Sequence, residues 1–370
     1  MPHSPAPNTL ATQWRRQEHA AKSPFFQTWD WLGTWHALTS AEAAPEPLIL
    51  EADGKTNGLA FLCHQRVTRH RVLGVNRVIL NETGRPTFDG LTLEYNGLVA
   101  ADSDREAAFT AFIDTLAQDT RWDEAQFSGL APVEYDLLTR LCAEQGWYPW
   151  IVDEKPCDYV DLAAIRAAGK GYEASLSRNT RYQIRRARKL YGGEDSVKLV
   201  AAKTTEEALA FFEEMRAPHQ VYWNARGQSG AYANPFFVTF HKELIARCFD
   251  NGTIDLLRCE ADGQLIGYLY NFVSHGCVYA YQSGFDYSED PKVKPGLVTH
   301  CAAINHYLDA GCGRYEFMAG EAQHKKSLGT DRYMMTWLVA QRPRLRLQAE
   351  RLLRQWRARM RDRRAAAESN

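Results

Sequence analysis

Residues 254–325 are the stretch that most constrains the fold of this chain. Their pattern predicts two or three antiparallel strands, a loop, a helix that opens at Pro295-Gly296, one further strand and a polar turn ending at Lys325. The N–H groups in the first turn of a helix have no partner inside it, and the helix dipole favours negative charge there. The order strand, loop, helix, strand therefore predicts an anion-binding site where the helix begins, and points to group transfer.

Composition limits the class of protein. The chain has 370 residues, of which 45% are hydrophobic and 24% charged, which is typical of a soluble globular protein with about two domains. The sequence contains no run of about 18 apolar residues, so we predict no membrane span. Residues 1–21 are polar and rich in Pro, and we interpret them as a loose leader without the apolar segment of a signal peptide.

Cysteine usage indicates a reducing compartment. No two cysteines form a C-x-x-C pair, and most lie within apolar runs, so we expect reduced, buried thiols of a cytoplasmic protein, with no disulfide framework and no metal site. The eight are Cys63, Cys142, Cys157, Cys248, Cys259, Cys277, Cys301 and Cys312.

The first half has its own α/β rhythm. The aromatic segment 24–38 and residues 104–117 and 132–145 are predicted helices, the last with Pro132 in its first turn and Gly146 beyond its end. Strands are predicted at 48–51, 59–67, 71–80, 91–99, 124–128 and 158–162.

A basic helix at 172–191, ended by Gly192-Gly193, is predicted to link the halves. Its apolar face carries Leu176, Ile184, Ala187, Leu190 and Tyr191, and its other face carries Arg178, Arg181, Arg185, Arg188 and Lys189. The basic face is either solvated or in contact with phosphates or an acidic partner.

The second half repeats the rhythm. Strands are predicted at 197–201, 254–260, 265–273, 278–285, 315–318 and 333–340, with a hairpin turn at 261–264. Helices are predicted at 204–216, 234–250 and 296–310, with a loop at 221–230 and a short helix or turn at 322–328. The shared order of elements suggests two copies of one architecture.

The C-terminal tail is strongly basic. Residues 342–364 carry ten Arg against Glu350 and Asp362, a net charge of +8 in a chain whose total is −1. The helical period gathers Leu345, Ala349, Leu352, Leu353, Trp356 and Met360 on one face. Either that face docks on the body, or the tail contacts a membrane surface or RNA.

Several motifs, in order, resemble those of the GNAT-fold acyltransferases of the CelD-like group, which is linked to cellulose and exopolysaccharide biosynthesis and related to the Fem-type peptidyltransferases. They are the aromatic segment 25–31 (FFQTWDW), the basic segment 177–188, the strand 279–286 (YAYQSGFD), Lys294-Pro295-Gly296, and 317–321 (FMAGE) followed by His324-Lys325. The likeness covers most of residues 20–340. The pyrophosphate loop departs from the common Q/R-x-x-G-x-G/A signature, because residues 292–297 contain one Gly.

The resemblance implies a tandem GNAT fold of the α/β (α+β) class. The implied domains are an N-terminal GNAT-like domain at 22–168 without a donor site, a linking helix at 172–192, a C-terminal GNAT domain at 196–341 and a tail helix at 343–364.

The resemblance also implies a donor site for acetyl-CoA or another acyl-CoA, with no metal. Strand 278–285 would splay from strand 315–318, and the pantetheine arm would lie in the gap. The implied donor-binding residues are Gln282, Ser283, Gly284, Lys294, Pro295, Gly296, Leu297 and Lys325.

Acyl transfer to an amine needs a base and a way to stabilise the leaving thiolate. Glu321 and Asp286 follow strand ends and are candidate bases, with His324 as an alternative, and Tyr281 could protonate the thiolate. Each has a structural interpretation as well, as a solvated loop residue, a hydrogen-bonded histidine or a packed aromatic.

The acceptor, a small-molecule amine, is expected at the loop that follows helix 204–216, where aromatic and Arg side chains suit a sugar or an amphipathic amine. The candidates are His219, Tyr222, Trp223 and Arg226; a Trp in a loop can equally be a packing residue.

Three hypotheses follow. The first is an acyl-CoA-dependent N-acyltransferase acting on a small molecule or an envelope precursor. The second is a Fem-type aminoacyl-tRNA-dependent transferase, favoured by the basic helix and tail. The third is a GNAT-like protein that binds without turnover. The sequence leaves the acceptor, the acyl chain length and the oligomeric state open.

Overall fold

The computed structural model describes residues 7–193, 195–353, 356 and 360. An 11-stranded mixed sheet runs through both halves of the chain in the order β1-β2-β3-β4-β11-β5-β10-β9-β8-β7-β6. The strands are β1 Glu46–Ala52, β2 Lys55–Arg69, β3 Leu73–Leu80, β4 Glu124–Leu130, β5 Tyr148–Asp161, β6 Val197–Ala201, β7 Ile254–Ala261, β8 Gln264–Ser274, β9 Cys277–Phe285, β10 Arg314–Ala319 and β11 Asp331–Gln341.

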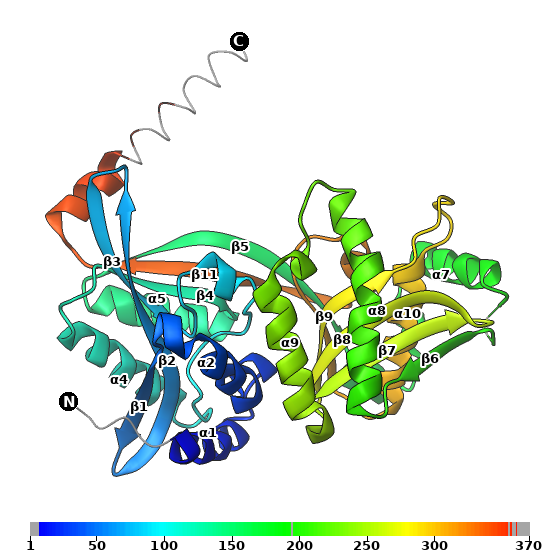
Figure 1. Cartoon of the computed structure of the whole chain (residues 1–370), viewed down its shortest axis with the longest axis horizontal. Helices are drawn as coiled ribbons and strands as arrows, with labels where there is room; N and C mark the ends of the chain where they lie inside the picture. Colours follow the sequence, from blue (N-terminus) through cyan, green and yellow to red (C-terminus); the bar gives the residue numbers. More distant parts are fainter. Residues whose placement is uncertain (1–6, 194, 354–355, 357–359, 361–370) are drawn as a thin grey trace.

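Helices cover both faces of the sheet in each lobe (Figure 1). The α-helices are α1 Pro7–Ala21, α2 Trp29–Ala43, α3 Pro86–Asp89, α4 Arg105–Gln118, α5 Pro132–Glu144, α6 Leu162–Ala167, α7 Arg178–Leu190, α8 Thr205–Asn224, α9 Pro235–Cys248, α10 Pro295–Asp309 and α11 Gln323–Leu328. The 3-10 turns are η1 Phe25–Gln27, η2 Tyr172–Ser175, η3 Ala231–Ala233 and η4 Phe249–Asn251.

The repeated rhythm of the two halves is confirmed by the strand pairing. In the first half β1–β3 are antiparallel, and β4 pairs parallel to β3 after the crossover helix α4. In the second half β7–β9 are antiparallel, and β10 pairs parallel to β9 after α10. The hairpin at 261–264 is also confirmed, because Asp262 and Gly263 both have positive φ, as a type I′ turn requires.

The halves share two strands. β11 comes from the end of the chain yet lies between β4 and β5, and β5 lies between β11 and β10. These two long strands bridge the lobes in Figure 1. Residues 331–341 therefore complete the first half of the sheet, and the two halves share one sheet. The domain boundaries at 168, 196 and 341 stay predictions.

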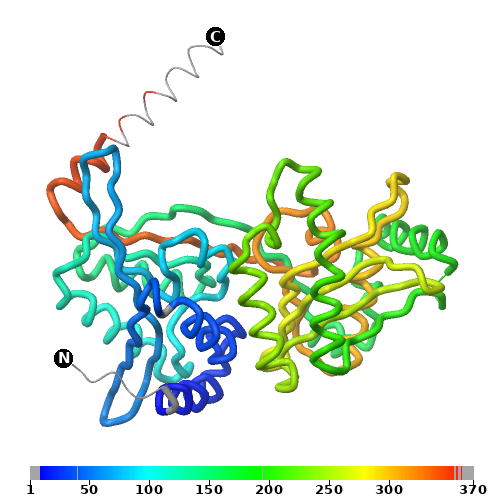
Figure 2. The backbone as a smooth tube through the Cα atoms, viewed as in Figure 1, coloured from blue at the N-terminus to red at the C-terminus, as the bar shows by residue number. Residues whose placement is uncertain are grey.

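One aromatic core also joins the halves. The aromatic segment 24–38 packs against the second half of the chain. The Phe25 ring stacks on Phe272 of β8 with centroids 4.1 Å apart, and Trp31 meets Phe240 of α9 edge-on. Figure 2 shows the blue N-terminal helices beside the green segment that includes α9. Burial of these rings holds the lobes together through the hydrophobic effect.

The prediction of a loose leader at 1–21 was wrong for the described part. Residues 7–21 form α1, and Trp14 is fully buried, stacks on Phe61 and donates its indole N–H to Gln27 O. The apolar residues Leu10, Trp14 and Ala21 recur at helical spacing, so the helix buries one face.

The strand predicted at 91–99 is a loop. Thr92 and Tyr95 have φ near +55°, a left-handed conformation that lies outside the strand region. Among the described residues, the segment 91–99 pairs with a strand through one bridge, between Leu59 and Val99. β5 was also underestimated, since it begins at Tyr148 and not near 158.

The linking helix begins later than predicted. Residues 172–175 form a 3-10 turn, and α7 begins after Ser177, whose hydroxyl accepts the Thr180 N–H. Arg188, predicted on the exposed face, is buried and pairs with Glu173 at 2.5 Å, whereas Leu190, predicted on the apolar face, is half exposed.

The tail does not dock the apolar face predicted from its sequence on the body. Residues 345–353 are helical, but Leu345, Leu352 and Leu353 are exposed, while Leu347 is buried. Of the residues predicted for this helix, 354, 355, 357–359 and 361–364 lie outside the described part.

Candidate functional site

A cavity lies where β9 and β10 diverge. The two strands pair over 277–279 and 314–316, and beyond that point the β10 register shifts and Met318 takes a positive φ. On β9 a bulge at 280–282 shifts the register against β8. The predicted splay is therefore confirmed, and a cavity of about 350 Å³ opens in the gap. Its lining is Thr92, Glu94, Tyr222, Trp223, Ala280, Tyr281, Gln282, Ser283, Phe285, Tyr287, His300, Phe317, Met318, Ala319, Gly320, Glu321, Ala322, His324 and Lys325.

The start of α10 adjoins this cavity through Phe285 and His300. Pro295 occupies the first helical position, where its missing N–H costs nothing, and no side chain caps the helix. The amides of Gly296 and Leu297 belong to the first turn and have no partner within the helix. A Cβ on Gly296 would lie 3.3 Å from the Phe285 ring, so glycine permits this close packing. Lys294 is half-buried beside the turn.

Lys325 is held against the end of β10. Its Nζ donates to the carbonyl oxygens of Met318, at 3.2 Å, and Ala319, at 3.0 Å. Burial lowers the pKa of Lys325, and the nearby carboxyl of Glu94 opposes that effect. The ammonium therefore lies in the cavity wall and borders the gap between the strands.

Glu94 is a residue of the cavity lining that the sequence prediction missed. It comes from the N-terminal half, is 2% exposed, and its Oε2 accepts the Ala319 N–H at 2.8 Å. Burial raises the pKa of Glu94 to about 7, partly offset by the Ala319 N–H and by Lys325. A carboxyl that is half ionised near neutral pH suits proton transfer. The sequence signal was Asn96-Gly97, a turn dipeptide inside the apolar run that was predicted as a strand.

The predicted catalytic residues lie in different surroundings. Glu321 is exposed at the rim of the cavity. His324 lines the cavity and stacks on His300 at 5.4 Å, and burial lowers the pKa of His324 to about 4, so it is neutral at pH 7. Asp286 is exposed and does not belong to the lining.

The hydroxyl of Tyr281 is engaged in the interior. It donates to Leu91 O at 2.5 Å and lies 3.1 Å from His241 Nε2, and burial raises the pKa of Tyr281 well above its usual value. Other atoms of the side chain reach the cavity wall. In this arrangement the phenol proton is committed to Leu91 and is not directed at a leaving group.

The predicted donor residues on β9 separate into two groups. Gln282 and Ser283 line the cavity. Gly284 is buried under α8 instead, because a Cβ there would lie 2.7 Å from Met215 O. Glycine at this position therefore serves the packing of the helix on the strand.

The predicted acceptor residues lie on the last turns of α8 and just beyond, not in a loop at 221–230. Tyr222 and Trp223 line the cavity, whereas His219 and Arg226 support them from behind. The Trp223 indole donates to His219 Nε2 at 3.0 Å, and the Arg226 guanidinium lies 3.5 Å from the Tyr222 ring centroid.

His219 connects the acceptor group to β9. Its Nε2 lies 3.2 Å from Gln282 Oε1 and 3.0 Å from the Trp223 indole nitrogen, and its Nδ1 lies 3.1 Å from Gln220 Oε1. Burial lowers the pKa of His219. This neutral histidine fixes the helix end beside the donor strand.

The equivalent gap in the N-terminal half is filled by the protein itself. β3 and β4 pair over 77–79 and 124–126 and then separate. Asn96 enters the gap, donates its backbone N–H to Gly129 O and its side-chain amide to Leu80 O, and accepts from Asn81. The corresponding helix, α4, begins among Asp102, Asp104 and Glu106, which would repel a pyrophosphate.

These features define a class of fold. In the GNAT arrangement two parallel central strands splay, and the helix that connects them starts at the gap. This arrangement occurs here at β9, α10 and β10, in a mixed α/β architecture with two GNAT-like halves on one sheet. Residues 178–326 match the family model described as "Acetyltransferase (GNAT) domain". This match contains the β9–β10 gap and Lys325, and supports acyltransferase chemistry at the level of the family.

Solved structures share the fold at low sequence identity. The chain is similar to FemX, with a TM-score of 0.59 and 12% identity over 88% of this chain and 94% of that one. It is also similar to the C-terminal domain of a putative lysylphosphatidylglycerol synthetase from Agrobacterium fabrum (TM-score 0.54, 11% identity, 91% and 93% coverage) and to L-PGS from Bacillus licheniformis (0.54, 10%, 94% and 95%). No curated protein sequence matches the chain.

Within the described residues, no group of three or more His, Cys, Asp or Glu side chains is placed to hold a metal ion. No helix in the same part of the chain is long and apolar enough to cross a membrane.

Proposed function

We propose that this protein is an N-acyltransferase of the CelD-like group that moves an acyl group, most simply acetyl, from acyl-CoA to an amine of a small molecule or an envelope or exopolysaccharide precursor. The observation that carries the proposal is the cavity between the diverging strands β9 and β10, next to the uncapped start of α10. Unpaired edge groups of β9 can hold a thioester carbonyl, and the first-turn amides of α10 can hold a pyrophosphate.

In this proposal the donor and acceptor meet inside the cavity. The pantetheine arm lies between Gln282-Ser283 on β9 and Phe317 on β10, with the pyrophosphate at 294–297. Lys325 supplies positive charge near the reacting carbonyl or a donor phosphate. The amine enters past Tyr222 and Trp223, whose rings can cover the apolar part of an acceptor.

Glu94 takes the role of base in the proposed reaction. The ionised carboxylate accepts one proton from the ammonium, and the free amine forms a C–N bond with the thioester carbon. The C–S bond then breaks, and the second proton of the amine nitrogen passes to the departing sulfur, so the products are the amide and the CoA thiol. With its pKa near 7, the carboxyl is both ionised in part and basic enough at neutral pH. Glu321, at the rim, is the second candidate for this role.

The same proposal includes a cytoplasmic location, where acyl-CoA is available. The proposal is supported by cysteines that are held as thiols, the form found in a reducing compartment.

Calorimetry with acetyl-CoA tests the donor site. We expect binding that is lost in Gly296→Val, because the branched side chain meets Phe285 and obstructs the amides. Gly171→Val is the matched control, since a Cβ there meets nothing within 4 Å and its φ is not positive. If neither acetyl-CoA nor longer acyl-CoAs bind the folded protein, the proposal is wrong.

A Fem-type aminoacyl-tRNA-dependent transferase is the second candidate. It is favoured by the structural likeness to FemX over both halves and by exposed Arg178, Arg185 and Lys189 on α7. Binding of charged tRNA with a steep salt dependence, in the absence of acyl-CoA binding, would select this candidate. Acyl-CoA binding without transfer to any amine would instead select a non-catalytic binding protein.

A further inference from the structure

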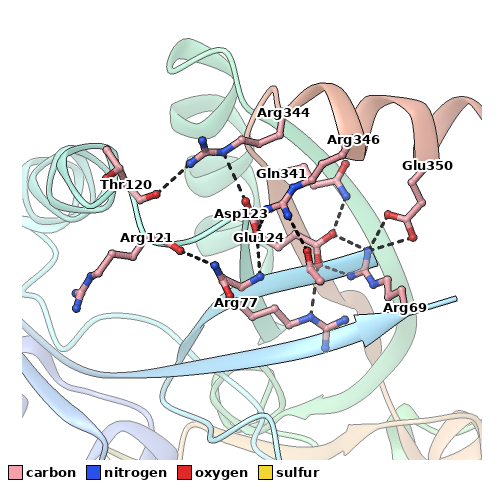
Figure 3. Close-up of polar contacts among 12 residues, drawn as sticks. Arg69, Arg77, Thr120, Arg121, Asp123, Glu124, Gln341, Arg344, Arg346 and Glu350 are labelled. Carbon is pink, nitrogen blue, oxygen red and sulfur yellow. Dashed lines mark hydrogen bonds and ion pairs between the residues drawn. The ribbon is translucent and has the colours of Figure 1, made fainter. Parts of the chain in front are cut away.

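The tail helix is anchored to the N-terminal lobe by one side. Leu347 is fully buried, and Glu350 pairs with Arg69 at 3.1 Å and with His70 at 3.4 Å, both at the end of β2. Arg346 pairs with Asp123 at 2.5 Å. Figure 3 shows Arg344, Arg346 and Glu350 directed from the tail toward Asp123 and Arg69. The orientation of residues 344–350 is therefore set by contacts with the body.

The opposite side of the tail is apolar and faces solvent. Leu345 is 84% exposed, Leu352 62%, Leu353 45% and Trp356 58%. At about 100° per residue these four fall within an arc of roughly 100°, and Leu347 lies on the far side of the helix. We call them the apolar stripe. An exposed stripe of this kind is uncommon on a monomeric protein and indicates an interaction surface.

The tip of the β2–β3 hairpin extends the same surface. Val72 at the tip is 86% exposed, and Arg71 beside it is exposed as well. The ion pair of Glu350 with Arg69 and its contact with His70 hold this tip next to the tail, and Figure 1 shows the two side by side at the top of the N-terminal lobe.

The charge around the stripe restricts what can cover it. Residues 342–364 carry a net charge of +8. A second copy of the chain would bring a second such tail against the first, and a nucleic acid would satisfy the arginines but leave Leu and Trp side chains in water. An anionic bilayer satisfies both, because leucines enter the acyl boundary, Trp lies at the interface, and the arginines of the tail other than Arg342, Arg344 and Arg346, which the body holds, are available for phosphates.

We propose that the apolar stripe and the hairpin tip form a docking surface for an anionic lipid membrane. On the membrane the tail helix lies in the plane of the interface, and the body, which carries a net charge of −9 without residues 342–364, is kept on the aqueous side. This proposal does not depend on the acyl donor.

Vesicle sedimentation of the full-length protein tests the proposal. We expect binding to vesicles of phosphatidylcholine with about one third phosphatidylglycerol, weakened as salt is raised, and at least ~10-fold weaker binding to phosphatidylcholine alone. Leu352→Ser with Leu353→Ser should lower the partition coefficient by roughly 10-fold or more, because two exposed leucines no longer enter the bilayer.

The matched control is Val133→Ser with Val221→Ser, which removes two apolar side chains that are 57% and 67% exposed elsewhere. It should leave vesicle binding unchanged, and both double variants should keep the circular dichroism spectrum of the parent. Absence of binding to anionic vesicles, or binding that survives the leucine substitutions, overturns the proposal. So does a dimer, detected by light scattering without lipid, that the leucine substitutions dissociate.

Discussion

Replacing Glu94 by Gln should flatten the dependence of stability on pH between pH 6.5 and 8. Gln has the shape of Glu and can still accept the Ala319 N–H, so the variant removes a titrating group and keeps the local contact. A carboxyl whose pKa is raised in the folded protein favours folding fully below its unfolded value, and that contribution is lost as the pH rises through the folded pKa. For Glu94 this contribution to the free energy of unfolding falls as the pH rises from about 4.5 to about 7, and its last part is lost above pH 7.

The magnitude follows from the two pKa values. With 4.5 for the unfolded chain and about 7 for the folded protein, one group lowers the free energy of unfolding by about 1 kcal/mol between pH 6.5 and 8. Below pH 6.5 buried histidines act in the opposite direction, since the pKa of His324 is lowered to about 4 and stability is gained as the pH rises from there. Histidines in the unfolded chain still lose protons just above pH 6.5, but their effect is the same in the parent and in the variant, so the difference between the two proteins isolates Glu94.

Urea unfolding at pH 6.5, 7, 7.5 and 8 measures this effect. Burial also raises the pKa of Glu18 and Glu316 to about 7 and of Glu82 to about 8. These carboxyls add to the fall in the parent's free energy of unfolding between pH 6.5 and 8. Glu94→Gln should make that fall smaller by about 1 kcal/mol. Glu321→Gln, which changes an exposed carboxyl on the same cavity, is the control and should leave the slope unchanged. An equal slope in the parent and in Glu94→Gln would refute the raised pKa and, with it, the proposed base.

Three further predictions test packing and hydrogen bonding. Trp14→Ala should cost about 3–5 kcal/mol in urea unfolding, because the fully buried ring leaves a cavity, whereas Trp356→Ala should change stability by less than about 0.5 kcal/mol; equal effects would contradict the burial of α1. Gly284→Ala should cost about 1–3 kcal/mol, because its Cβ meets Met215 O at 2.7 Å, and an unchanged melting temperature would show that α8 yields. Asn81→Ala should speed hydrogen exchange in residues 91–99, because it removes the hydrogen bonds to Asn96 and to Gly97 O; unchanged exchange would mean that the loop is held by other contacts.

Elements with local signals were predicted well. Pro295 fixed the start of α10, Thr204 capped α8, and Asp262-Gly263 made the hairpin, and each acts through the backbone within a few residues of itself. The splay of β9 from β10 was also predicted, since it follows from the order of strands and the crossover helix.

Elements whose state depends on distant partners were predicted poorly. The run at 91–99 has the apolar content of a strand, but the protein uses it to fill the gap between β3 and β4, with Asn96 bonded to both. The tail has the periodicity of a docked helix, but ion pairs from Glu350 and Arg346 fix its other side on the body. Hydrophobic periodicity reports which residues share a face, and not which face is covered.

The sequence by itself determined the order of strands and helices in residues 254–325, the turn at 261–264 and the amide-rich helix start at Pro295, because these depend on the chemistry of neighbouring residues. Only the tertiary structure decided the composition of the site. Glu94 and Ala319 are 225 residues apart, and they meet because the filled gap of the first half presents its loop to the open gap of the second. The burial that raises the pKa of Glu94 exists only once both halves have closed around it, so no local pattern could reveal it.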